Sequence, residues 1–177
     1  MHPLTYYSID IETTGLDIQK SQILEIGCVK VYPNGDKEEF HSIVCDPILY
    51  GEPYALSMHS ELLKLIAGHG GAHKPVQNAI KELSIFIQGE NSPVLAGKNV
   101  AMFDLPILRN WGFTEKVKHR VMDVGNMYFH KFGYIPSLDE INKLIDYTPV
   151  SHRALDDAKN VVAAIEYLQR ELNETKK

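Results

Sequence analysis

The sequence predicts an α/β domain with a mixed sheet, in which an antiparallel meander precedes parallel strands flanked by helices. Two observations carry this prediction. As far as Val44, apolar and polar residues tend to alternate with the period of a strand. After that point, apolar residues recur at helical spacing, with short apolar runs between the helical segments, which is typical of parallel pairing. The 177 residues fit one domain, because no linker rich in Gly, Ser or Pro divides them.

The first strands are expected to pair in the order in which they occur. Residues 6–12 alternate between apolar and polar side chains, and a second strand is expected over residues 22–32. Residues 33–36, Pro-Asn-Gly-Asp, are typical of a hairpin turn into a third strand over residues 37–44. The chain therefore opens as an antiparallel meander.

Two helices are expected next, separated by a glycine-rich loop. Apolar residues indicate a short helix around residues 62–66 and a longer helix over residues 76–87, with Pro75 at its first position. The loop between them contains His69 and His73. No carboxylate or thiol stands at a supporting position beside this pair, so a zinc site is not expected there.

The remaining elements alternate between strands and helices. They are a buried strand over residues 94–96, a helix that begins at or near Asp104 and stops before Gly112, a last strand over residues 120–124, and helices over residues 138–145 and 154–172. Ser137 and Glu140 match a capping box ahead of the first of these last two helices. Residues 173–177 are expected to fray.

The composition argues against several classes of protein. Cys28 and Cys45 are too few for a secreted disulfide framework or a thiolate metal site. The chain has no signal peptide and no apolar run near the ~20 residues of a membrane span, so a soluble, cytoplasmic protein without a membrane partner is expected. A net charge of -5 argues against coating nucleic acid by bulk electrostatics. It is compatible with an enzyme that holds a nucleic-acid end at an acidic site neutralised by cations.

Asp10 and Glu12 stand two positions apart on the first strand. Both side chains therefore project from one face, with Cα atoms about 6.5–7 Å apart. Such a pair most often marks a solvated sheet face. Here the opposite face is apolar, and residues 13–15, Thr-Thr-Gly, turn the backbone directly afterwards. Carboxylates at the end of a central strand are costly unless they bind something positive, so a cation site is the alternative interpretation.

Three further residues are candidates for the same site. Asp104 lies at the edge of an apolar block, although it would also serve as a helix N-cap. His152 and Asp157 are five residues apart, which on one helix separates two side chains by about 140°. They converge only if His152 precedes the helix and Asp157 lies in its first turns, which Pro149 and Ser151 favour. The alternatives are an exposed capping histidine and a carboxylate paired with the helix dipole.

Together, these carboxylates and the histidine suit metal-dependent hydrolysis. Hard oxygen ligands without a set of thiols favour Mg²⁺ or Mn²⁺. Two such ions about 4 Å apart stabilise the attacking water and the departing oxygen of a phosphoryl displacement. A histidine is suited to accept a proton from that water near neutral pH.

Three segments resemble the exonuclease motifs of the DEDDh 3'-to-5' exonuclease family. They are SIDIETTGLD with Asp10 and Glu12, NVAMFDLPIL with Asp104, and HRALDDA with His152 and Asp157. The resemblance covers residues 6–170, with the motifs in the family's order. It implies an RNase H-like fold with a mixed five-stranded sheet, and a single exonuclease domain over residues 1–177. It also implies hydrolysis of single-stranded DNA or RNA from the 3' end, with release of nucleoside 5'-monophosphates.

The resemblance also implies roles for individual residues. The metal-site carboxylates would be Asp10, Glu12, Asp104 and Asp157. Asp10 would bridge two divalent cations, Mg²⁺ or Mn²⁺, while Asp104 would act through coordinated water. His152 would be the general base, whereas Asp156 matches no ligand position. Because the family includes dimers and polymerase-associated subunits, both assemblies are open for this chain.

A second set of residues is expected to contact the substrate. They are Thr13, Leu16, Lys98 and Asn99. Thr13 would meet the terminal nucleotide through its backbone and the 3'-hydroxyl, and Leu16 would wedge against a base. Lys98 stands where many members carry His, and it would meet either a backbone phosphate or only solvent. A basic stretch, which is either a track for a single strand or a mixed-charge surface, comprises Lys98, Arg109, Lys116, Lys118 and Arg120.

Large side chains near the motifs are expected to pack rather than to bind bases. Core positions are expected for Met102, Phe103 and Trp111. Packing is also the first interpretation for Tyr128, Phe129 and Tyr134, with a nucleotide groove as the alternative.

Two questions stay open at the level of sequence. The motifs do not distinguish DNA from RNA, because that discrimination depends on contacts to the 2'-hydroxyl. The alternative function is a non-catalytic module that retains the fold and binds nucleic acid or a protein partner. The complete set of carboxylates and histidine argues against it, because binding alone has no chemical need for all of them.

Overall fold

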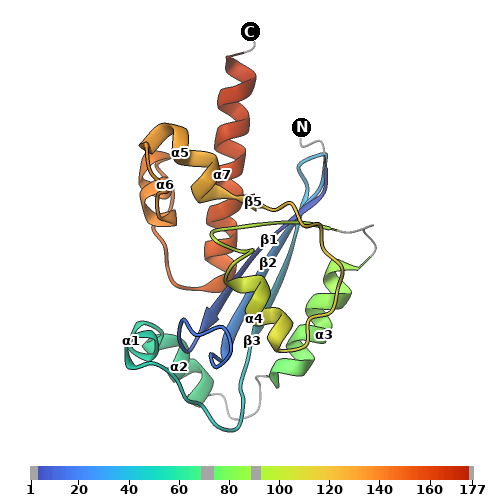
Figure 1. Ribbon diagram of the computed structural model, residues 1–177, viewed down its shortest axis with the longest axis vertical. Coiled ribbons are helices and arrows are strands. Elements are labelled where there is room, and N and C mark those ends of the chain that lie inside the picture. The colour runs from blue at the N-terminus through green and yellow to red at the C-terminus, as the bar shows by residue number, and fades with distance from the viewer. Residues whose placement is uncertain (1–3, 69–73, 89–92, 176–177) are drawn as a thin grey trace.

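A computed structural model describes residues 4–68, 74–88 and 93–175 of the chain (Figure 1). At its centre lies a five-stranded sheet with strand order β3-β2-β1-β4-β5. The strands are β1 (Tyr6–Thr13), β2 (Ile23–Val31), β3 (Lys37–Ile43), β4 (Val94–Gly97) and β5 (Met122–Asp123). Strands β1, β2 and β3 pair antiparallel, and β4 and β5 extend the sheet in parallel from β1. The predicted mixed sheet is confirmed.

Helices cover both faces of this sheet. They are α1 (Pro53–Met58), α2 (Ser60–Gly68), α3 (Val76–Ile87), α4 (Asp104–Asn110), α5 (Val124–Phe132), α6 (Leu138–Leu144) and α7 (Ala154–Glu174). In Figure 1, α7 lies on one side of the sheet with α5 and α6 beside it, and α3 lies on the other side. The pair α1 and α2 lies near the end of the sheet at which α7 begins.

Strand β1 divides the core into two clusters. Its odd-numbered apolar side chains pack with α3 and α4, whereas Tyr6 packs with α5, α6 and α7. On the second face, the Ser8 hydroxyl donates a hydrogen bond of 2.9 Å to the Ala158 carbonyl of α7. Because side chains alternate along a strand, Asp10 and Glu12 face α7 as well.

Strand β2 and the start of α7 approach each other closely at Gly27. A Cβ atom at Gly27 would lie 2.2 Å from the carbonyl carbon of Ala154 and 2.3 Å from the backbone nitrogen of Leu155. Glycine is the residue that permits this approach, because it has no Cβ. The first turn of α7 is therefore seated directly on β2.

The largest difference from the predicted elements lies between β4 and α6. The strand predicted over residues 120–124 is limited to Met122–Asp123, and helix α5 follows at once. The Asp123 side chain caps this helix by accepting a hydrogen bond of 3.2 Å from the Asn126 N–H. A left-handed Gly133, with φ of 75°, ends the helix. Helix α1 was not predicted either.

Other boundaries differ by less. Pro75 precedes α3 as its N-cap instead of occupying its first position, and α7 continues to Glu174. The capping box of Ser137 and Glu140 is present, as predicted. Met102 is 70% exposed, so its predicted place in the core is wrong, because it lies in the turn that precedes α4.

Two remaining expectations concern a loop and the membrane. His69 and His73 lie outside the described residues. In the part of the chain that the structure describes, no helix is both long enough and apolar enough to cross a membrane.

Replacing Gly27 with alanine is expected to destabilise the fold. The added Cβ would meet backbone atoms, which cannot rotate away, and overpacking of this kind costs about 1–3 kcal/mol. Thermal melts should show a lower Tm, by about 2–4 °C for each kcal/mol. Gly68→Ala is the matched control, because a Cβ there meets nothing within 4 Å. Equal melting temperatures for the two variants would contradict the close approach.

Candidate active site

Three of the candidate side chains meet between the carboxyl end of β1 and the start of α7. One ligand atom from each of Glu12, His152 and Asp157 lies within 4.8 Å of the other two. Glu12 and Asp157 are buried, whereas His152 is exposed. Asp10 and Asp104 fall outside this group of three, although both interact with it electrostatically. Two carboxylates and an imidazole at this spacing form a donor set that suits a divalent cation.

His152 lies ahead of α7, and Asp157 lies in the first turn of that helix. His152 has a left-handed backbone with φ of 52°, and Arg153 is extended before the helix begins at Ala154. The Asp157 carboxylate accepts a hydrogen bond of 3.2 Å from the Ser151 N–H, which turns the chain back over the helix. The two side chains thus converge across the start of the helix, although Ser151 itself is not the N-cap.

Asp104 reaches across to the central strand. Its carboxylate accepts a hydrogen bond of 3.1 Å from the Ile11 N–H of β1, a contact that spans two separate motifs. The residue is buried at the first position of α4, and Phe103 takes the N-cap position without a side-chain cap bond. The interpretation of Asp104 as a simple helix cap is therefore wrong.

The cluster concentrates negative charge in a poorly hydrated space. Burial, followed by repulsion from Asp157, raises the pKa of Glu12 to about 8. Burial raises the pKa of Asp104 to about 7, even though backbone N–H groups stabilise its charged form. Desolvation and repulsion from Asp104 and Glu12 raise the pKa of Asp10 well above its usual range. Without a counter-charge, the site therefore retains protons near neutral pH.

His59 is a member of this environment that the sequence prediction missed. It lies between α1 and α2, is buried, and places its Nε2 3.3 Å from Glu12 Oε2. Burial lowers its pKa, with His152 adding to the effect, so the neutral ring is favoured. Nothing in the local sequence distinguishes His59 from a surface histidine, because its contact with Glu12 depends on how α1 and α2 fold back.

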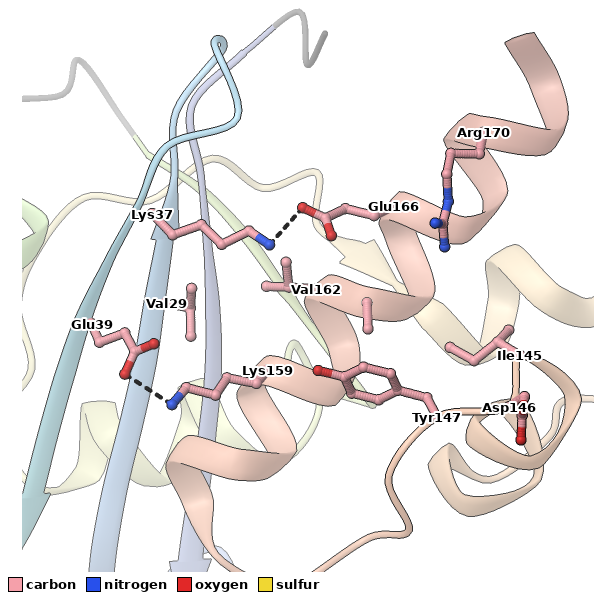
Figure 2. A pocket seen from close by; sticks show the side chains of 11 residues that line it. Val29, Lys37, Glu39, Ile145, Asp146, Tyr147, Lys159, Val162, Glu166 and Arg170 are labelled. Atoms are coloured by element: carbon pink, nitrogen blue, oxygen red, sulfur yellow. Dashed lines mark ion pairs between the residues drawn. The ribbon is translucent and has the colours of Figure 1, made fainter. Parts of the chain in front are cut away.

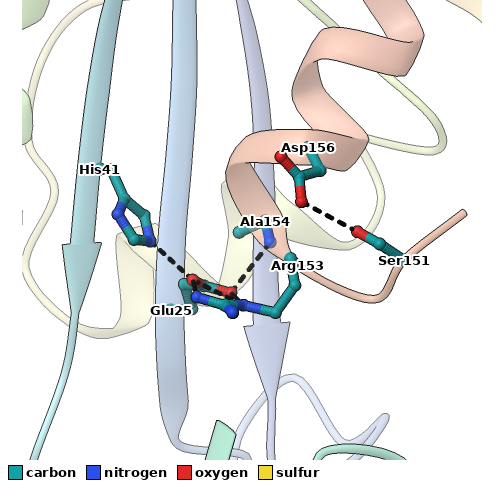
Figure 3. A network of polar contacts seen from close by, with 6 residues as sticks. All are labelled: Glu25, His41, Ser151, Arg153, Ala154 and Asp156. Atoms are coloured by element: carbon teal, nitrogen blue, oxygen red, sulfur yellow. Dashed lines mark hydrogen bonds and ion pairs between the residues drawn. The ribbon is translucent and has the colours of Figure 1, made fainter. Parts of the chain in front are cut away.

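Glu25 is a second residue that the prediction missed. It lies opposite Glu12 in the register of β1 and β2. Burial opposes its ionisation, but hydrogen bonds from His41 and Arg153 outweigh that effect and lower its pKa to about 2. Figure 3 shows its carboxylate between His41 on one side and Arg153 and Ala154 on the other. A charged glutamate in an otherwise apolar strand segment was the signal that could have identified it.

The residues predicted to contact substrate lie in two places. Thr13 is buried and its hydroxyl donates to the Gly15 carbonyl at 2.7 Å, whereas Leu16 next to this turn is 76% exposed. Lys98 is half-buried over Gly125 at the start of α5. Asn99 has a left-handed backbone, and its N–H donates to Asp123 at 2.7 Å.

The predicted basic stretch is not uniformly available to a ligand. Arg109 donates to the carbonyls of Phe113 and Glu115, at 2.7 and 2.5 Å, and so holds the segment after α4. This contact favours the interpretation of a mixed-charge surface at Arg109.

A separate cavity of about 490 Å³ lies between α7 and the strands β2 and β3 (Figure 2). None of the candidate active-site residues lines it. Two of its cations are paired with acids, Lys37 with Glu166 at 2.8 Å and Lys159 with Glu39 at 2.9 Å. These ion pairs neutralise both lysines, so they do not make the cavity an anion site.

Comparison with known proteins identifies the family. A family model described as an exonuclease, that of RNase T, matches residues 8–165. The chain belongs to the DEDDh exonuclease family. Its mixed sheet is accordingly that of an RNase H-like fold, and membership supports a nuclease function.

Curated relatives are large polymerases that contain a similar segment. The chain is 28% identical over 166 residues to the PolC-type DNA polymerase III of Thermotoga petrophila, covering 88% of this chain and 11% of that protein. It is 30% identical over 105 residues to the PolC-type DNA polymerase III of Streptococcus agalactiae serotype III, covering 59% of this chain and 6% of that protein. The chain thus spans only a small part of these relatives.

Solved exonucleases share the fold at low sequence identity. A zinc-bound complex of Escherichia coli exonuclease I with single-stranded DNA has a TM-score of 0.73 at 13% identity, covering 95% of this chain and 41% of that chain. A full-length 3'-exonuclease has a TM-score of 0.69 at 16% identity, covering 97% of this chain and 62% of that one. At these identities the likeness establishes the fold.

Asp104→Asn is expected to stabilise the metal-free protein in a pH-dependent manner. The variant keeps an oxygen that accepts the Ile11 N–H but cannot ionise. The folded pKa of about 7 exceeds the usual value of about 4, so the carboxyl costs nothing below pH 4. As pH rises from 4 to 7, the free energy of unfolding of the wild type therefore decreases, and above pH 7 it stays at the lower value. The variant should melt several degrees higher at pH 8, at about 2–4 °C per kcal/mol.

The control for this comparison is Glu174→Gln, which removes an exposed carboxylate near the end of α7. Both melts are recorded with EDTA at pH 4.5 and pH 8. If the gain of Asp104→Asn were the same at the two pH values, the electrostatic account of the cluster would be wrong.

Proposed function

We propose that the chain is a metal-dependent 3'-to-5' exonuclease that converts single-stranded nucleic-acid ends into nucleoside 5'-monophosphates. The observation that carries the proposal is the meeting of Glu12, His152 and Asp157 on separate elements of an exonuclease fold. Buried carboxylates that hold protons near neutral pH become metal ligands when divalent cations displace those protons.

The donor set fits divalent cations that prefer oxygen ligands. Glu12, Asp157, Asp10 and Asp104 would hold two such ions, Mg²⁺ or Mn²⁺. When bound, the ions would supply positive charge that stabilises the attacking and departing oxygens of the phosphodiester. The mutual repulsion of the carboxylates, which is unfavourable without cations, favours their binding.

His152 would act as the general base. Its exposed imidazole would take a proton from the attacking water as the water oxygen bonds to phosphorus. The bond between phosphorus and the 3'-oxygen of the preceding nucleotide breaks, and that oxygen takes a proton from solvent. Exposure of His152 lets its proton pass to bulk water after each cycle.

The substrate side of the site would be formed by Thr13 and Leu16, with Lys98 and Asn99 as a second contact region. The exposed Leu16 can press against a terminal base, and its backbone N–H is held by Glu52 at 3.1 Å. The single-stranded DNA of the exonuclease I complex supports a single-stranded ligand. The PolC-type relatives support association with a polymerase as one biological setting.

The primary test uses 3'- and 5'-labelled single strands of RNA and DNA, matched in sequence. With Mn²⁺, we expect shortening from the 3' end and nucleoside 5'-monophosphates as products, and EDTA should abolish both. The relative rates on RNA and DNA then define the preferred polymer. Binding without shortening of either polymer would instead favour a non-catalytic module and reject the enzyme.

Substitution of the proposed base should slow the chemical step. His152→Ala is expected to lower kcat about 10²- to 10⁴-fold with little change in KM, because a positioned base contributes that range. Asp10→Ala should abolish turnover by removing the proposed bridging ligand. His130→Ala is the control, since His130 is exposed on α5, outside the cluster. A kcat for His152→Ala equal to that of the wild type would contradict the role of His152 as general base.

A further inference from the structure

Glu25 is a buried carboxylate that the proposed chemistry does not use. It stands opposite Glu12 on the neighbouring antiparallel strand, where like charges are unfavourable. Its negative charge also adds to the repulsion on Asp10 and Glu12. An apolar residue would pack in the core of the sheet without this cost. The position of Glu25 therefore calls for a specific role.

The Glu25 carboxylate binds the two residues that follow His152. Arg153 donates to it from Nη2 at 2.7 Å and from Nε at 3.1 Å, and the Ala154 N–H donates at 3.0 Å. His41 on β3 lies 2.6 Å from the same carboxylate. Since these partners occupy both oxygens, Glu25 is engaged in a clamp instead of being available as a further metal ligand (Figure 3).

The segment around His152 is held from its other side as well. The Ser151 N–H donates to Asp157 at 3.2 Å, and the Ser151 hydroxyl lies 3.3 Å from Asp156. His152 stands between these two anchors, with a left-handed backbone that is costly for a residue with a side chain. Contacts on both sides are what allow such a conformation to persist.

We propose that Glu25 is a positioning residue, which clamps Arg153 and Ala154 and thereby aims the His152 imidazole at the carboxylate cluster. The inference rests on the proposed role of His152 as the base. Gly27, two residues after Glu25 on β2, also helps to position this segment, because it allows the first turn of α7 to lie directly on the strand. The exposed base is thus held through its backbone, and its side chain stays accessible to substrate.

The direct test is Glu25→Gln, assayed at saturating Mn²⁺ on a labelled oligomer. The variant keeps the shape and one oxygen acceptor but loses the charge that binds Arg153. We expect kcat to fall about 10- to 100-fold, the range for loss of a supporting contact, and KM to stay within about 2-fold. Glu38→Gln is the matched control, because it makes the same substitution at an exposed carboxylate of β3 that takes no part in the clamp.

A double-variant cycle separates positioning from other effects. If Glu25 acts through His152, adding Glu25→Gln to His152→Ala should lower the residual kcat no further. An equal fall in both backgrounds would overturn the proposal. So would an unchanged kcat of Glu25→Gln at saturating Mn²⁺ with a higher Mn²⁺ concentration needed for half-maximal activity, which would assign Glu25 to the charge balance of the cluster.

Hydrogen exchange tests the clamp without relying on activity. Amides of residues 151–157 should exchange faster in Glu25→Gln than in the wild type, and at the wild-type rate in Glu38→Gln. Unchanged exchange in Glu25→Gln would overturn the clamp even if the enzyme is active. A wild-type protein that shortens neither polymer would instead reject the proposed function, with the exchange data still deciding whether Glu25 holds the segment.

Discussion

The contact between the first turn of α7 and the strands β1 and β2 is the constraint on which the site depends. The strands supply one set of carboxylates, and the helix supplies Asp157 and the preceding His152. These groups can meet only where a helix backbone lies directly on a strand. Gly27 permits that approach on β2, and Ser8 fixes it on β1 with a hydrogen bond to Ala158. The polar Ser8 and the small Gly27 are thus explained by the helix that covers them.

The same contact brings together charges that would otherwise avoid one another. Burial and repulsion raise the pKa values of Asp10, Glu12 and Asp104, so the folded metal-free protein gives up stability as pH rises. Burial of apolar side chains in the surrounding core offsets this loss of stability. The neighbouring Glu25 behaves in the opposite way, because its partners are cations and N–H groups. Partner chemistry, more than burial, therefore decides which buried carboxylates stay charged.

Local patterns in the sequence were sufficient for much of the fold. Period-two alternation located β1, the Pro-Asn-Gly-Asp turn located the β2–β3 hairpin, and the capping box located α6. The strand predicted over residues 120–124 is present but limited to Met122–Asp123, because Asp123 caps α5, which begins at the next residue. Residue types and spacing singled out the residues of the motifs, and the structure brings Glu12, His152 and Asp157 together. His59 and Glu25 were missed because their partners are distant in sequence, and only the tertiary fold shows which histidine or glutamate meets the cluster.

The carboxylates and the histidine of the candidate site stand on different kinds of backbone. The carboxylates come from regular strand and helix positions, where hydrogen-bonded backbone fixes each Cα. The general base, which is the role we propose for His152, must instead reach water beside an open substrate end, and burial would obstruct that access. His152 stands on irregular, left-handed backbone outside the helix, which leaves its side chain exposed. Irregular backbone is free to move unless it is anchored, so an accessible base requires buried anchors on both sides of it. The buried charge of Glu25 and the turn made by Ser151 and Asp157 meet that requirement.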